Sequence, residues 1–182
     1  MGNERKYNNQ IQKQQYLQQA EQGDGDAILN LAHMDLEGLN GKYRPKKAMK
    51  WYQKAVEQKR PEAYINIGWI YAEHQGVKRN YRTALEWYQK ALHDPRTQAI
   101  AEANIGWLYL RIYRNYSAAR NYFQRAEAHG NANGAVGMGW LYQQGYGVPK
   151  DQAEAFRWFQ KAEHRQQPEA LLTIGQLFHH EK

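Results

Sequence analysis

The sequence predicts an all-α protein, an α/α solenoid in which stacked helix pairs wind as a right-handed superhelix. Two blocks of residues recur along the chain, they recur at a spacing in the thirties, and alanine is frequent while valine and isoleucine are few. A repeat of this length that holds two helical patterns is typical of helix pairs that bury their apolar faces only against neighbouring pairs. We therefore expect about ten antiparallel helices and no strand.

The first block describes a helix, here called helix A, in which a glycine precedes a tryptophan. The sequence EAYINIGWIY at 62–71 returns as EANIGWLY at 102–109 and as VGMGWLY at 136–142. A glycine inside a helix costs roughly 1 kcal/mol relative to alanine, so its recurrence predicts a place where a neighbouring helix comes close. The residues at this small position are Ala32, Gly68, Gly106, Gly139 and Gly175.

The second block describes the partner helix, helix B. The copies are AMKWYQKA at 48–55, ALEWYQKA at 84–91, ARNYFQRA at 119–126 and AFRWFQKA at 155–162. Their alanines and aromatic residues fall at i, i+3, i+4 and i+7, which is one apolar face of a helix. The tryptophans Trp51, Trp87 and Trp158 share one position on this face, and we expect them in the core.

A glycine-rich turn joins the two helices, most clearly in QGYGVPKD at 144–151. Its glycines supply positive φ, and Pro149 cannot continue the preceding helix. Asp151 has the position and side chain of an N-cap for the helix that follows.

These patterns predict a single repeat domain over residues 1–182, closed at both ends by a lone helix that acts as a cap. The expected parts are a capping helix at about 5–22, repeats at 27–62, 63–100, 101–133 and 134–169, and a terminal helix at 170–182.

The blocks resemble the Sel1-like repeat, a relative of the tetratricopeptide repeat. The fourth repeat carries the family pattern almost fully, in Gly139, Tyr142, Gly145, Gly147, Val148, Asp151, Ala155, Trp158, Lys161 and Ala162. The second repeat has His74 and Asn80 where the family has glycine and aspartate, and the turn of the third repeat is shorter by three residues. The resemblance implies a tetratricopeptide-like fold with scaffolding, adaptor or partner-neutralising roles, and no common chemistry.

Residues that carry chemistry are scarce. The chain has no cysteine, which excludes disulfides, zinc–thiolate sites and thiol nucleophiles. Its one serine, Ser117, lies outside any G-x-S-x-G motif, and neither a P-loop nor H-E-x-x-H occurs. The pair His179 and His180 is better interpreted as a solvated helix end than as a metal site. We expect no enzymatic activity, no cofactor and no bound metal.

The helix A tryptophans are the candidate binding residues. If tetratricopeptide geometry holds, Trp69, Trp107 and Trp140 face a concave groove, where exposed tryptophans would anchor a protein partner. The residues expected beside them, on the preceding turn, are Ile65, Ala103 and Val136. An equally weighted alternative is that these tryptophans pack between repeats.

A basic cluster is the second candidate surface. Residues 42–60 contain eight lysines or arginines against one glutamate, an excess that equals the net charge of +7 of the whole chain. The residues of this electrostatic patch are Lys42, Arg44, Lys46, Lys47, Lys50 and Lys54. Such a patch favours an acidic protein partner. Nucleic acid ranks lower because no repeating base-reading code is visible, and a merely solvated face is the simplest alternative.

Taken together, the sequence predicts a non-catalytic scaffold or adaptor that holds a partner protein in its groove. One alternative, implied by the resemblance, is an immunity-type protein that neutralises a secreted toxin enzyme such as a phospholipase; another is a nucleic-acid binder. No apolar run is long enough to cross a bilayer, so no membrane insertion is expected. The first 22 residues lack the apolar region of a signal peptide. The location is expected to be cytoplasmic for the chain as it stands, and periplasmic or secreted if a signal peptide has been removed.

Overall fold

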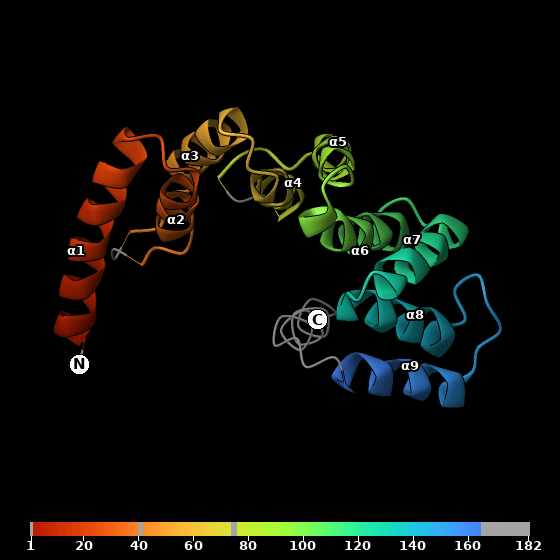
Figure 1. Ribbon diagram of the computed structural model, residues 1–182. Helices are drawn as coiled ribbons and strands as arrows, with labels where there is room; N and C mark the ends of the chain where they lie inside the picture. The colour runs from red at the N-terminus through yellow and green to blue at the C-terminus, as the bar shows by residue number, and fades with distance from the viewer. Residues whose placement is uncertain (1, 40–41, 74–75, 165–182) are drawn as a thin grey trace. The chain divides into compact units, whose positions relative to one another are not determined.

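The computed structural model describes residues 2–39, 42–73 and 76–164, with side chains from residue 8 onward. Throughout this part the regular secondary structure consists of nine helices and no strand (Figure 1). The helices are α1 (Gly2–Glu21), α2 (Gly25–Leu36), α3 (Pro45–Glu57), α4 (Glu62–Glu73), α5 (Tyr81–Ala91), α6 (Pro95–Arg111), α7 (Tyr116–Ala128), α8 (Ala132–Gln144) and α9 (Gln152–His164). The predicted all-α solenoid of helix pairs is confirmed. The expected terminal helix at 170–182, Gly175 and the pair His179 and His180 lie outside the described residues.

The helices after α1 form four pairs, α2 with α3, α4 with α5, α6 with α7 and α8 with α9. They divide into two compact units, Met1–Lys90 and Ala91–Lys182. The core of the first gathers around Tyr52, Ile67 and Ile70, and a core of the second around Phe123 and Leu141. In both units an aromatic side chain from helix B packs against aliphatic side chains from helix A, which is how amphipathic helices of this length become stable.

The glycines of helix A lie where helix B comes closest. A Cβ atom added to Gly106 would lie 2.6 Å from ring atoms of Phe123. At Gly68 the same atom would meet the ring of Tyr88 at 2.5 Å, and at Gly139 the ring of Phe159 at 2.5 Å. The helix A glycine therefore makes room for the second aromatic residue of the helix B block.

Each turn from helix A to helix B is closed by the same backbone hydrogen bond. The N–H of the residue before helix B donates to the carbonyl of the residue three positions after the small position of helix A. The bonds are Arg44 to Asp35 (2.7 Å), Asn80 to Tyr71 (3.0 Å), Asn115 to Tyr109 (2.9 Å) and Asp151 to Tyr142 (3.0 Å). The short third turn keeps this bond, so the lost residues are removed from the loop alone.

In three of these turns the residue that closes the turn also caps helix B with its side chain. The side-chain oxygens of Asn80, Asn115 and Asp151 accept from the backbone N–H of Thr83, Ala118 and Glu154 at 3.0–3.1 Å. Asp151 is thus the N-cap of α9, as its position in the turn indicates. Asparagine serves as well as aspartate because both supply the acceptor that an orphan helix N–H requires.

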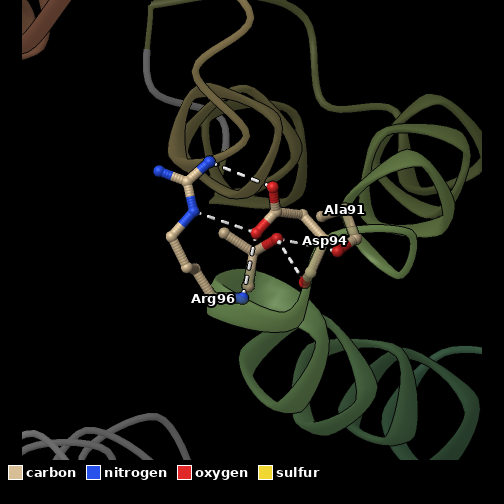
Figure 2. Close-up of polar contacts among 4 residues, drawn as sticks. Ala91, Asp94 and Arg96 are labelled. Carbon is tan, nitrogen blue, oxygen red and sulfur yellow. Dashed lines mark hydrogen bonds and ion pairs between the residues drawn. The ribbon is translucent and has the colours of Figure 1, made fainter.

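Helix α6 begins six residues before the expected start of the third repeat at 101, because Asp94 and Pro95 form a helix start (Figure 2). The Asp94 carboxylate accepts from the backbone N–H of Arg96 at 2.9 Å and from its guanidinium at 3.0 Å. These hydrogen bonds hold the pKa of Asp94 below its ordinary value. The buried Thr97 hydroxyl donates to the carbonyl of Ala91 at 2.7 Å, which ties the end of α5 to the first turn of α6.

Candidate protein-binding surfaces

Trp69 is the one exposed tryptophan among the described residues, with 39% of its surface accessible. It follows Gly68 on α4, and Gly68 packs on the ring of Tyr88 in α5. Successive helical residues differ by about 100° around the helix axis, because a turn holds 3.6 residues. Trp69 therefore points away from the helix pair contact, as a residue available to a partner must.

Trp107 and Trp140 occupy the same position on α6 and α8, but both are half-buried. The ring of Trp107 meets Phe123 edge-on at a centroid distance of 5.0 Å, and it packs against two clusters of the second compact unit. Trp140 packs against the cluster around Leu141. These two tryptophans thus combine packing against core clusters with a remaining accessible part.

The residues predicted beside the tryptophans lie mostly in the core. Ala103 and Val136 are 1% and 2% exposed, and Val136 belongs to a cluster with Ala132 and Ala162. Ile65 is half-buried. Ala103 and Val136 therefore lie out of reach of a partner, because their helix faces are turned toward neighbouring helices. In the first compact unit the helix A tryptophan surface consists of Trp69 and the accessible part of Ile65. In the second unit, Trp107 and Trp140 occupy the same helix A position.

The helix B tryptophans Trp51, Trp87 and Trp158 are half-buried rather than fully in the core. On each one lies the ammonium group of the lysine three residues later, at 4.8, 4.0 and 5.0 Å from the ring centroid. In the third repeat, Arg125 covers Tyr122 in the same way at 5.4 Å. A cation over an aromatic face contributes roughly 0.5–1 kcal/mol at exposed sites. The W-x-x-K spacing is present in the sequence and predicts this contact.

The basic patch lies on α3 and the segment before it. Its lysines Lys42, Lys46, Lys47, Lys50 and Lys54 are exposed, and Arg44 is half-buried. Exposed lysines in one helical segment produce a positive field that attracts acidic partners.

A buried carboxylate, Asp35, organises part of this patch. Asp35 is fully buried on α2, and its oxygens lie 3.0 Å from Nζ of Lys13 in α1, 3.5 Å from Arg44 and 4.0 Å from Lys47. Three cations around one carboxylate leave the cluster positive. The signal for this site was an aspartate at the position where the other repeats carry tyrosine.

A second buried carboxylate, Glu102, ties α6 to α7. It accepts from Arg125 at 2.8 Å and lies 2.7 Å from Nδ1 of His129. Pairing of this kind is what a fully buried charge requires. Glu102 is a structural contact, since its partners lie on α6, on α7 and at the residue that follows α7.

Within the described residues, no group of three or more histidine, cysteine, aspartate or glutamate side chains is arranged to hold a metal ion. In the same part of the chain, no helix combines the length and apolar character needed to span a membrane.

The stacked helix pairs define a helical-repeat protein. The family model for the Sel1 repeat matches residues 25–59, 61–93, 99–131 and 132–164, which is most of the chain. The chain belongs to the Sel1 repeat family, whose members generally mediate protein–protein interaction and generally act without catalysis.

Solved structures with the same fold include a Sel1 repeat protein from Oxalobacter formigenes (27% identity, TM-score 0.72, covering 87% of this chain) and a protective antigen of uropathogenic Escherichia coli displaying an SLR fold (30% identity, TM-score 0.71, 91% of this chain). This chain spans 63% and 36% of those two proteins. An immunity protein from Pseudomonas aeruginosa shares the fold at 22% identity and a TM-score of 0.60, covering 84% of this chain and 57% of its own. No curated protein matches by sequence.

Proposed function

We propose that the chain is a non-catalytic protein-binding scaffold that holds its partner on the helix A tryptophan surface. The observation that carries this proposal is the exposure of Trp69 in a repeat family that binds proteins. Tryptophan is enriched among the residues that dominate binding energy, because it brings a large apolar area at a small cost in conformational entropy. Trp107 and Trp140 provide the same residue at the same helix A position in the next two repeats.

The proposed partner is acidic. The exposed lysines of α3 lie on helix B of the first repeat, whereas the tryptophans occupy the helix A position of later repeats. Charges at the margin of an interface mainly raise the rate of association, whereas buried anchors slow dissociation. In this proposal the α3 patch raises the rate of association, and the tryptophans lower the rate of dissociation.

An immunity-type role is the narrower alternative within this proposal. A basic scaffold suits an acidic toxin enzyme, and proteins named as immunity proteins adopt this fold. The fold by itself does not choose between an adaptor and an inhibitor. Loss of the partner's enzymatic activity upon binding would identify an inhibitor, and a salt-dependent gel shift with nucleic acid would identify the remaining alternative.

The test is to capture the partner from the source cells and measure binding kinetics on folded variants by surface plasmon resonance. Trp69→Ala is expected to weaken binding by about thirtyfold, because truncating a central aromatic anchor costs about 2 kcal/mol or more. Phe156→Ala is the matched control, since Phe156 is an aromatic residue of α9 with 60% exposure that lies on helix B. It should bind normally.

The α3 patch is tested by reversing the charges of Lys46, Lys47 and Lys50. Association should slow and become less dependent on salt, while dissociation stays nearly unchanged. If Trp69→Ala binds normally and the lysine reversals abolish binding, the patch on α3 is the binding site and the tryptophan surface is not.

A further inference from the structure

The second compact unit carries an aromatic and basic surface at its turns from helix A to helix B. The turns α6–α7 and α8–α9 lie at the same end of this unit, on the right of Figure 1. Exposed side chains gather there, and we call them the tyrosine–arginine edge: Arg111, Ile112, Tyr113, Arg114, Arg120 and Tyr146. Ile112, Tyr113 and Tyr146 are 38%, 43% and 37% exposed.

The exposed rings of this edge are held in place by half-buried rings. Tyr146 stacks on Tyr116 at 4.8 Å with an angle of 5° between the planes. Tyr113 leans on Tyr109 at 5.6 Å, and Tyr109 in turn stacks on Tyr122 at 5.7 Å. A surface whose side chains are already ordered loses little conformational entropy when a partner binds. The stacking therefore preorganises the exposed side chains of the edge for binding.

The α6–α7 turn holds an arginine in a strained backbone conformation. Arg114 has φ of 50°, in the left-handed region that disfavours side chains with a Cβ atom. The turns of the first and fourth repeats use glycine for positive φ, at Gly38 and Gly145. A strained residue where glycine would be relaxed makes the Arg114 side chain a candidate for a functional role.

The arginines of the edge lie in a stretch of sequence that contains no carboxylate. No aspartate or glutamate occurs between residues 103 and 126. Among the described residues, no carboxylate forms an ion pair with Arg111, Arg114 or Arg120, whereas Arg125 is paired with Glu102. Free guanidinium groups beside exposed aromatic rings complement carboxylates, which arginine binds through two parallel hydrogen bonds.

We propose that the tyrosine–arginine edge is a second docking surface, and that its partner is an acidic protein segment in which carboxylates flank an apolar side chain. Ile112 lies among the aromatic residues and offers apolar contact without stacking, which suits a protein side chain better than a base. One face of Tyr109 is already covered by Tyr122, which reduces the stacking area left for bases. The edge belongs to the second compact unit, whereas Trp69 belongs to the first, and the two are tested with different variants.

The first experiment uses the full chain and three fluorescent probes. They are a short peptide with aspartates and glutamates around Leu-Phe, the same peptide with asparagine and glutamine instead, and a single-stranded oligothymidine. The acidic peptide should bind at low salt at least about tenfold more tightly than its neutral counterpart, because charge-assisted hydrogen bonds are lost in the latter. In NMR spectra it should shift the amide signals of residues 109–116 and 145–147.

The decisive variant is Arg114→Gly, which removes the side chain and the backbone strain together. Its melting temperature should be equal to or higher than that of the unchanged chain, while its affinity for the acidic peptide should fall about tenfold. Lys59→Gly is the matched control, because Lys59 also has positive φ, at 56°, and lies on the other compact unit. It should relax the same kind of strain without changing peptide binding.

Two further variants test whether binding needs an exposed tyrosine ring of the edge, or only a positive charge anywhere on this unit. Tyr113→Ala should lower the affinity for the acidic peptide. Arg157→Gln should leave that affinity unchanged, because Arg157 is an exposed arginine of α9 that lies outside the edge. The proposal is overturned if no acidic peptide binds, if Arg114→Gly or Tyr113→Ala binds it as tightly as the unchanged chain, or if the oligothymidine binds the edge more tightly than the peptide does.

Discussion

Phe123 illustrates how one side chain can join two repeats. It is fully buried on α7, and Cβ atoms added at Gly106 of α6 or at Gly137 of α8 would both collide with its ring. Trp107 meets the same ring edge-on. Because glycines confine the ring from both sides, it cannot move aside when one of them acquires a side chain. The contact with Phe123 thus explains why glycine occupies both helical positions despite its low helix propensity.

Gly106→Ala should therefore destabilise the protein, although alanine is the better helix former. The added methyl overpacks the contact with Phe123, which typically costs about 1–3 kcal/mol, and this cost opposes a gain in helix propensity of about 1 kcal/mol. Urea denaturation measures the change. The double variant with Phe123→Leu should show a smaller loss for the same glycine substitution. A rise in stability for Gly106→Ala would show that the ring is free to move.

His33 makes stability depend on pH. Burial lowers the pKa of this imidazole, an effect partly offset by Glu37, and its ring meets Tyr52 edge-on at 5.8 Å. The unfolded chain then takes up a proton more readily than the folded one. The contribution of neutral His33 to the free energy of unfolding is fully present above the unfolded pKa of about 6.5. It is lost as the pH drops through the lower pKa of the folded state.

The expected result is a lower free energy of unfolding at about pH 5.5 than at about pH 7.5. His33→Gln should lose less stability over the same interval, as measured by urea denaturation at both values. His93→Gln is the control, since His93 is exposed, and it should show the same pH difference as the unchanged chain.

At the scale of elements, Asp35 fastens the N-terminal helix α1 to the first repeat. Lys13 reaches from α1 to this buried carboxylate, beside cations that come from α3 and the residue before it. Asp35→Asn should destabilise the protein by about 1–3 kcal/mol, because the hydrogen bonds to a charged partner weaken and three cations lose their counter-charge. Amide hydrogen exchange in α1 should accelerate as its attachment loosens.

The matched control is Asp26→Asn on the same helix. Asp26 pairs with Arg60 at 2.8 Å but is 70% exposed, so its loss should cost less than about 1 kcal/mol. Equal effects of the two substitutions would mean that Asp35 is no more important than a surface ion pair.

The sequence predicted elements well where a local pattern defines them. The apolar face of helix B, the helix A glycines and the Asp151 cap all follow from residue types at fixed spacing. The start of α6 was missed because Asp94 and Pro95 act as a local helix start that interrupts the repeat spacing. The buried carboxylates Asp35 and Glu102 were missed because their burial depends on cations brought by other helices.

For the candidate site, the sequence located the tryptophan positions but not their accessibility. Trp69, Trp107 and Trp140 share one helix A position, yet only Trp69 is exposed. In the second compact unit Phe123 packs against Trp107, and two core clusters contact it. The exposure of each tryptophan thus depends on the side chains that neighbouring repeats place against it. A repeat pattern cannot predict this exposure, because it records only what the repeats share.

On the scale of the whole molecule, the two compact units should respond separately to local damage. Each contains its own buried cluster, around Tyr52 in one and Phe123 in the other. In repeat proteins stability is approximately a sum over neighbouring interfaces, so opening need not be global. Gly106→Ala should accelerate amide hydrogen exchange in α6, α7 and α8 and leave α2 and α3 unchanged. Equal acceleration in both units would show that the chain opens as one cooperative structure.

The hydrogen bond that closes every helix A to helix B turn uses backbone atoms only. It holds whether the residue that donates is arginine, asparagine or aspartate, and it survives the loss of three residues in the third turn. The helix hairpin is consequently compatible with different loop sequences and lengths. Transfer of a loop such as 111–114 to another repeat is therefore expected to leave the hairpin of the receiving repeat intact.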